Sequence, residues 1–445
     1  MTNVKSSFNI NLSYGRLVFV LCILLLWISL NLSYYFVISP LYAYSGFTFN
    51  PDIHKLIESL FITIFIAWIL PWKIRKPSDF MINILFTMPV LPTLSLYWLR
   101  GENRLYTYML IISFMVVRVV VKMTPEIKLL RIKRGIKVGW IVSLIFTITI
   151  LGYLIYRGGL RYFNLNLLKV YDFRRKVGAV INVGIFGYLN TWVFKLFNPV
   201  LISWSLYKRR YTLFVFFTCL QVVFFGISSH KSVLFYPLLI IALFVLLQKY
   251  QTMNVFFLTL FGAIGLTVIL AIVFKQVVPA SLLIRRVFFV PARLNYAYYD
   301  FFSQEGFVYM SNSVLSSFIN YPFAYPPPQM ISVYLQGHPY TWMNNGFLAT
   351  SYMHFGFCGM IAYSFIVGLL LGIVDSLSKN RLPLWFSTSL VIVPFFSLFT
   401  SADLTTALLT HSLGPSLIIL WLFSSRSTFV EGRGKKCSIK LKSAT

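Results

Sequence analysis

Basic side chains gather in two segments of this chain that separate long apolar blocks. Lys231 adds a single cation in the motif SSHKS, a tight turn between two such blocks. Guanidinium and ammonium groups are the usual protein ligands of phosphate. These residues therefore predict a site for an anionic ligand as the simplest explanation, and contact with lipid headgroups is the alternative. The two segments carry Arg157, Arg161, Lys169, Arg174, Arg175 and Lys176, and then Lys275, Arg285, Arg286 and Arg293.

Three charged residues of the second segment follow a seven-residue spacing. Arg286, Arg293 and Asp300 would share one face of a helix. Pro291 interrupts the pattern, because proline starts or kinks a helix. Two arginines and a nearby carboxylate could bind a phosphate, but an amphipathic surface helix would show the same pattern.

Proton transfer needs a carboxylate or an imidazole near the cations. Asp172 and Asp300 share segments with the arginines, and His338 lies in the motif GHPY. We expect Asp300 and Asp172 to be the first candidates for a base, followed by His338. An aspartate beside an arginine is more often its ion-pair partner, and a lone loop histidine is more often structural.

Tyrosine and phenylalanine crowd the segment from Tyr296 to Trp342, which carries few charges and should pack. Such rings suit a membrane interface and also stack on sugar rings. The segment leads into NNGF at 344–347 and then to Gly356 and Gly359, a Gly-x-x-Gly pair that permits close helix approach or a bend.

The elements that position these residues are apolar blocks long enough to cross a membrane. Hydrophobic residues make up 58% of the 445 positions and charged residues 11%, which excludes a soluble domain. We predict an all-α, polytopic integral membrane protein, a single domain over 1–445 with about twelve spans, and an uncleaved first block. The blocks are 17–30, 57–72, 80–98, 105–121, 138–156, 178–206, 211–227, 232–248, 254–274, 360–374, 384–400 and 405–423.

The distribution of positive charge predicts the orientation. Lysine and arginine total 39 against 11 acidic residues, and most lie in segments that share a side if both termini are cytoplasmic. The loop 157–177 and the long loop 276–345 then face outward, and 425–445 is a basic cytoplasmic tail. Because the membrane accounts for the charge, no nucleic-acid partner is expected. The four cysteines show no metal-ligand spacing.

Four segments together resemble the Wzy-type O-antigen polymerases, which join oligosaccharide repeat units in bacteria. They are KVYDFRRK at 169–176, GISSHKSVLFYPLL at 226–239, RRVFFVPARLNYAYYDFF at 285–302 and NNGFLATSYMHFGFCG at 344–359. The last segment also resembles the O-antigen ligases, but Asn344 stands where their histidine would be. This departure favours a polymerase and leaves the identity of the base open.

The resemblance implies a GT-C-like, metal-independent membrane glycosyltransferase without a cofactor, acting at the outer face of the bacterial inner membrane. Its substrate would be an undecaprenyl-pyrophosphate-linked oligosaccharide, and a chain-length regulator and a flippase would be candidate partners. Glycan contacts are expected from Tyr299, Asn345 and Tyr352. The expected pyrophosphate ligands are Arg174, Arg175, Lys231, Arg285, Arg286 and Arg293.

Two other classes of function remain open. A secondary transporter would show internal repeats, and none is found here. A lipid-linked oligosaccharide flippase would need charged residues inside the spans, which are few: Glu58, Arg118 and Lys195.

Overall fold

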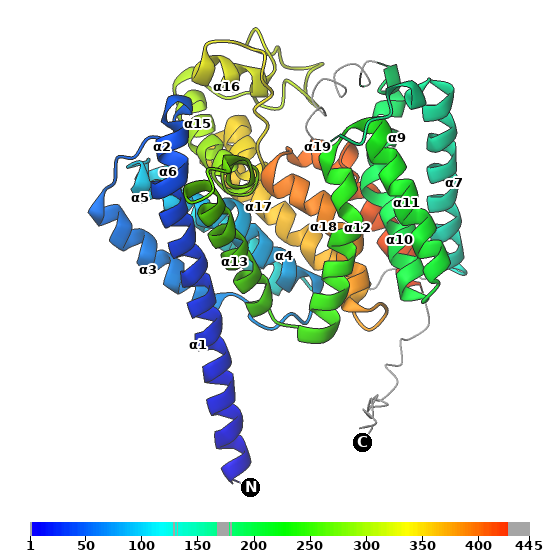
Figure 1. Cartoon of the computed structure of the whole chain (residues 1–445), viewed down its shortest axis with the longest axis horizontal. Helices are drawn as coiled ribbons and strands as arrows, with labels where there is room; N and C mark the ends of the chain where they lie inside the picture. The colour runs from blue at the N-terminus through cyan, green and yellow to red at the C-terminus, as the bar shows by residue number, and fades with distance from the viewer. Residues whose placement is uncertain (1, 128–129, 131, 167–177, 179, 426–445) are drawn as a thin grey trace.

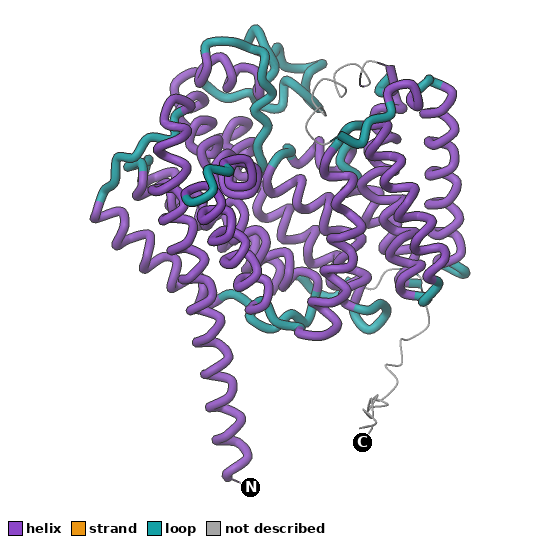
Figure 2. The backbone as a smooth tube through the Cα atoms, viewed as in Figure 1, coloured by secondary structure: helices purple, strands orange, loops and turns teal. Residues whose placement is uncertain are grey.

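The computed structural model describes the whole chain except residues 1, 128–129, 131, 167–177, 179 and 426–445. Side chains are described from Tyr14 onward. Regular structure in this part is helical, as predicted, and the extended pairing there is an isolated antiparallel bridge between Lys73 and Thr252. Figure 2 shows helices throughout, with the loops gathered at the two ends of the bundle.

The first part of the chain forms helices that are mostly joined by short turns. They are α1 (Thr2–Ser33), η1 (Tyr34–Ile38), α2 (Ser39–Tyr42), η2 (Ala43–Ser45), α3 (Ile53–Ile69), α4 (Pro77–Leu85), η3 (Phe86–Val90), α5 (Leu91–Leu99), α6 (Arg104–Met123), α7 (Gly135–Tyr156), η4 (Gly159–Tyr162), α9 (Ile185–Trp192), η5 (Val193–Phe197) and α10 (Asn198–Tyr207).

The second part continues in the same way and includes the predicted long loop. Its helices are α11 (Tyr211–Ser228), α12 (Lys231–Val245), η6 (Leu246–Tyr250), α13 (Asn254–Ile272), α14 (Val277–Ala280), η7 (Ser281–Phe289), α15 (Val290–Glu305), α16 (Pro327–Gln336), α17 (Phe347–Ser378), α18 (Leu384–Thr400), α19 (Leu404–Leu409) and α20 (Leu413–Ser424).

Eight helices in the described residues are long and apolar enough to cross a membrane. They fall on eight of the predicted blocks. The other four blocks correspond to α3, to α9–η5–α10, to α18 and to α19–α20, which are helical but are not among the eight. The chain therefore has the helices of a polytopic membrane protein, and the count of twelve spans stays a prediction.

Four of the five π segments in the described residues stand just before a proline; η6 is the exception. The π segments η1, η3, η5 and η7 end at Ile38, Val90, Phe197 and Phe289, and in each case a proline stands two residues later. Proline has no N–H, and its ring clashes with the carbonyl four residues earlier. The preceding turn therefore opens to the i→i+5 pattern, and the helix continues instead of breaking.

The bundle has two ends that carry different kinds of connection (Figure 1). At one end, where α1 begins, lie the short connections before α4 and after α17; we call it the α1 end. At the opposite end lie α16, the start of α15 and the start of α12; we call it the α16 end. The segment α4–η3–α5 is buried except at Asp79 and Trp98, which are half-buried. The predicted long loop 276–345 is thus largely folded, with α14, η7, α15 and α16 inside it.

The Gly-x-x-Gly pair bends α17. Phe355 and Gly356 have non-helical backbone angles, with φ of +61° at Gly356. A Cβ on Gly359 would lie 2.3 Å from the carbonyl oxygen of Ser351, so the turns on either side of the kink pack at a distance that only glycine permits. The predicted bend is confirmed.

Candidate site for an anionic ligand

A cavity of about 560 Å³ opens at the α16 end, between the turn after α2, the η7–α15 helix and the segment after α16. Arg285, Arg286 and Arg293 line it. We call it the basic cavity. Its wall is completed by Trp342 and by polar groups from Gln336, Thr341 and Asn344, and the described residues that line it include no aspartate or glutamate. Such a wall offers many hydrogen-bond donors and a net positive field to an anion.

Two of the arginines are held by aromatic rings. The guanidinium of Arg285 lies 4.2 Å from the ring centroid of Tyr42, and that of Arg293 lies 5.4 Å from the centroid of Phe47. A guanidinium stacked on a ring keeps its N–H edge available for a second partner. In the described part of the chain, the buried Nε of Arg285 has no hydrogen-bond partner. The rings therefore fix the planes of these cations and leave donors for a ligand.

A left-handed turn brings the backbone close to Arg293. Gly46 ends the first helical rod with φ of +82°, and a Cβ there would lie 2.3 Å from an Nη of Arg293. The glycine thus serves the turn and also leaves room for the guanidinium.

The seven-residue spacing is realised only in part. The π segment η7 leads into α15 with Pro291 in its first turn, and Arg286 and Arg293 reach the same cavity. Asp300 lies two turns beyond Arg293 and is not among the residues that line the cavity.

A smaller cavity of about 250 Å³ adjoins the basic cavity, because Arg286 lines both. Lys231, at the start of α12, and Tyr42 contribute to its wall. The tertiary structure therefore brings Lys231, from the turn SSHKS, next to Arg285, Arg286 and Arg293, which lie in a separate segment of the sequence.

Behind Arg293 lies a set of coupled charges from the loop between α5 and α6. Arg100 and Glu102 form an ion pair of 2.5 Å that is mostly shielded from solvent. Burial, opposed by Arg100, raises the pKa of Glu102 to about 7, and burial together with Arg100 lowers the pKa of Arg293 to about 10. Burial also raises the pKa of Asp300, again against the field of Arg100. Arg293 is therefore charged at neutral pH, and the carboxyl group of Glu102 titrates near neutral pH.

Three tyrosines pack together beside Asp300. The ring centroids of Tyr299 and Tyr352 are 5.1 Å apart, and Tyr106 lies 5.0 Å from Tyr299 and 5.9 Å from Tyr352. Tyr106 and Tyr352 are buried, whereas Tyr299 is half-buried. Of the expected glycan contacts, Tyr299 is thus the more accessible tyrosine.

Asn345 connects two helices through hydrogen bonds. Its side-chain amide donates to the Asn295 Oδ1 at 2.8 Å and to the Pro291 carbonyl at 3.2 Å, and the residue is buried. It ties the start of α17 to α15. The neighbouring Asn344 lines the basic cavity instead.

The remaining predicted site residues lie apart from the arginines or outside the described chain. His338 stacks on Tyr340 with 5.2 Å between ring centroids, and its buried Nδ1 has no partner among the described residues. It stands between Gln336 and Thr341, which line the basic cavity. Asp172, Arg174 and Arg175 lie outside the described residues.

Two pairs of residues were not chosen as site residues from the sequence. Arg100 and Glu102 were not chosen, although the motif RGEN places two opposite charges between apolar blocks. His354 and Asp403 were not selected either. They form a buried pair at 3.6 Å, with the Nδ1 of His354 accepting from the Met310 N–H at 3.2 Å. This pair joins the kink in α17 to two other segments, which no local pattern reveals.

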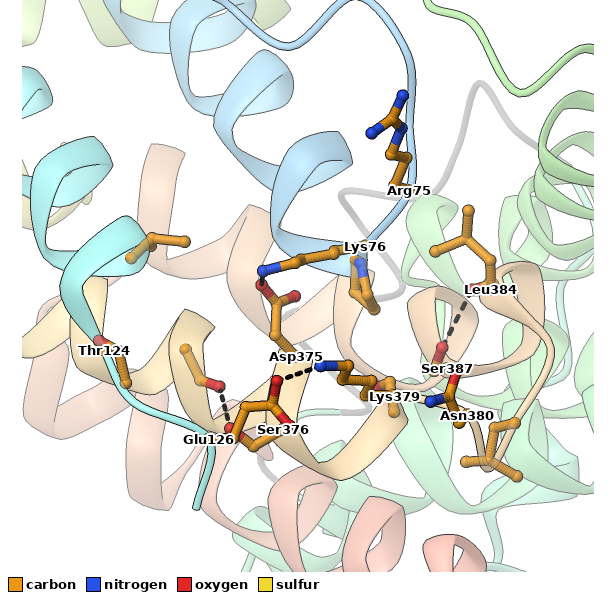
Figure 3. Close-up of a pocket in the computed structure, with 15 residues that line it drawn as sticks. Arg75, Lys76, Thr124, Glu126, Asp375, Ser376, Lys379, Asn380, Leu384 and Ser387 are labelled. Atoms are coloured by element: carbon orange, nitrogen blue, oxygen red, sulfur yellow. Dashed lines mark hydrogen bonds and ion pairs between the residues drawn. The ribbon is translucent and has the colours of Figure 1, made fainter. Parts of the chain in front are cut away.

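A second polar cavity, of about 300 Å³, lies at the α1 end; we call it the α1-end pocket (Figure 3). Two of the three basic residues that line it face carboxylates. Lys76 lies 3.9 Å from Asp375, and Lys379 pairs with Glu126. The buried Asp375 also accepts from the Ser78 N–H at 3.0 Å and from its hydroxyl at 2.6 Å.

Comparison of the chain with models of protein families, with curated proteins and with solved structures finds no match.

Proposed function

We propose that this chain is a membrane polymerase that joins oligosaccharide repeat units carried on undecaprenyl pyrophosphate, at the outer face of the bacterial inner membrane. The observation that carries the proposal is the basic cavity. Three arginines line about 560 Å³ at the end of the bundle that the charge distribution assigns to the outside. A lipid-linked pyrophosphate is an anion that could reach such a cavity from the membrane.

The chemistry would be a glycosyl transfer in which atoms and charges balance. A hydroxyl oxygen of the acceptor unit attacks the anomeric carbon of the donor chain. The bond from that carbon to the pyrophosphate oxygen breaks, and the oxygen keeps the electron pair. The acceptor proton passes to a carboxylate, and lipid pyrophosphate leaves.

The arginines would stabilise the charge that develops on the leaving group. Preorganised cations in a water-poor site lower such barriers by several kcal/mol. Arg285 and Arg293 are already fixed by Tyr42 and Phe47, so little reorganisation would be needed on binding.

Two carboxylates are candidates for the base. Asp300 lies on α15, two turns beyond Arg293, and Glu102 is electrostatically coupled to both residues. A base works best with a pKa near the operating pH, which favours Glu102, whose pKa is raised to about 7. Tyr299 would offer a ring to a sugar beside Asp300.

The test is the length distribution of glycan in a strain from which the native gene is deleted. The wild-type chain should restore a ladder of polymer lengths. Arg286→Ala and Arg293→Ala should give only single repeat units on the lipid core, because repeat units are still made and transferred but not joined.

Other outcomes of this experiment count against the proposal. Full-length ladders from both variants at normal protein level would contradict it. Loss of single-unit product as well would favour a flippase or a ligase.

A further inference from the structure

A groove of about 510 Å³ runs between α3 and α6 on the side of the bundle. We call it the α3–α6 groove. Its walls are the apolar side chains of Ile57, Phe61, Ile62, Ile111 and Ile112. Phe61 and Ile112 are 67% and 46% exposed, so the groove is open to the surroundings of the bundle. Apolar concave surfaces of this size commonly bind hydrophobic ligands.

One end of the groove is polar and fully hydrogen-bonded. There the carboxylate of Glu58 accepts from Arg104 at 2.8 Å, from the Tyr108 hydroxyl at 2.9 Å and from the Tyr97 hydroxyl. Glu58 lies in the second turn of α3 and Arg104 begins α6. Arg104 compensates the charge of Glu58, so this end attracts a phosphate less than the arginines of the basic cavity do.

A short segment leads from this end to the basic cavity. Phe47 lines the cavity, and six residues later Ile53 begins α3. Six residues span at most about 20 Å. The segment is fixed along α5, because the N–H groups of Asn50 and Asp52 each donate to α5 carbonyls at 2.9 Å.

One cation lies beside this segment. Lys55, in the first turn of α3, donates to the carbonyl oxygens of Gly101 and Glu102 at 2.7 and 2.8 Å. Glu102 is coupled to Arg293 of the basic cavity. The apolar groove and the cationic cavity thus lie near opposite ends of one short stretch of chain, from Phe47 to the first turns of α3.

We propose that the α3–α6 groove binds the isoprenoid chain of the lipid-linked substrate while its pyrophosphate occupies the basic cavity. The inference rests on the proposed function, since it assigns the two parts of that substrate to two places. The match is one of polarity: an amphipathic ligand has an apolar tail and an anionic head, and the chain offers an apolar groove and a cationic cavity that a short segment joins.

The experiment measures binding of two probes to the full-length protein in lipid nanodiscs. One probe is a long-chain polyprenyl pyrophosphate, and the other is inorganic pyrophosphate, which has no tail. Ile112→Trp fills the groove. Ile148→Trp is the matched control, because Ile148 is a 58% exposed isoleucine on α7, away from the groove.

Ile112→Trp should weaken binding of the polyprenyl probe at least tenfold and leave binding of inorganic pyrophosphate unchanged. Ile148→Trp should change neither, and Arg293→Gln should weaken both. Unchanged affinity of the polyprenyl probe for Ile112→Trp would overturn the groove assignment and leave the proposed function standing. Failure of the wild-type protein to bind either probe would overturn both.

A labelling arm separates the substrate tail from bulk lipid. A polyprenyl pyrophosphate with a photoreactive group on its tail should label peptides of α3 and α6, and unlabelled polyprenyl pyrophosphate should suppress the labelling. Equal suppression by phosphatidylglycerol at the same concentration would show a general lipid surface and overturn the inference.

Discussion

The basic cavity and the α1-end pocket both carry lysine or arginine, but the two sites handle that charge differently. In the α1-end pocket, Lys76 and Lys379 face Asp375 and Glu126 (Figure 3). In the basic cavity, the described lining residues carry three arginines and no carboxylate. Compensated charge ties helices together, whereas charge left without a carboxylate in the wall can be used on a ligand. Positive charge alone therefore does not mark a site.

Helix positions explain why the α1-end pocket is structural. Asp375 near the end of α17 accepts from Ser78 in the first turn of α4, and Lys379 reaches Glu126 after α6. These contacts join three helices at one end. In the basic cavity, Arg285 and Arg293 are instead fixed by the rings of Tyr42 and Phe47, which contribute packing without neutralising them.

The largest effect should come from removing one cavity arginine. Arg293→Gln should lower polymer formation by roughly 10²–10³-fold, because one charge that stabilises the leaving group is lost. Arg293→Lys should be less impaired, since it keeps the charge but not the planar fork. Polymer length per folded protein is the measurement. Lys379→Gln in the α1-end pocket is the control, and an equal loss there would remove the contrast between the two sites.

Breaking the α1-end pocket should instead lower stability. Asp375→Ala leaves Ser78 and Lys76 without their acceptor and should cost about 3 kcal/mol of unfolding free energy. Thermal unfolding in detergent measures this loss. Polymer formed per folded molecule should stay within twofold of wild type, and Ser376→Ala serves as the neighbouring control.

A methyl group at Gly46 should disturb the basic cavity at a distance from any ligand. Gly46→Ala must hold φ of +82° and places its Cβ on the Arg293 guanidinium, a combined strain of about 1–3 kcal/mol. We expect roughly tenfold weaker pyrophosphate binding. Gly158→Ala, with φ of +74° and its nearest contact at 3.7 Å, tests whether backbone strain alone produces this loss.

The smallest effect concerns pH. Because the pKa of Glu102 is raised from 4.5 to about 7 in the folded chain, the folded state binds more protons than the unfolded state between these values. Stability should therefore fall as pH rises from about 4.5 to 7. Glu102→Gln should flatten this dependence, measured as the unfolding midpoint against pH. An unchanged slope would mean that Glu102 is not buried beside Arg100.

Several features could be read from the sequence because they depend on neighbouring residues. Apolar blocks predict the helices, since a run of such residues buries its backbone polar groups most readily in a helix. The bend at Gly356 and the start of α15 at Pro291 also follow from single residues. The seven-residue spacing correctly joined Arg286 to Arg293, although Asp300 turned away from their cavity.

Other features depended on contacts between segments far apart in the chain. Tyr42 and Phe47 hold arginines more than two hundred positions away, and Arg100 and Glu102 acquire their importance only beside Arg293. Asn345 looked like a ligand but braces α15, while Asn344 faces the cavity. Both residues precede α17 in a non-helical segment, where no helical periodicity predicts which way a side chain points.

The sequence by itself determined the helices, the π turns before their prolines and the presence of cations between apolar blocks, because propensity, sterics and charge are local properties. Only the tertiary structure decided which cations lie beside carboxylates and which share a cavity. Whether a cation pairs with a carboxylate depends on a few ångströms of distance between side chains of different helices. The packing of the whole bundle fixes those distances.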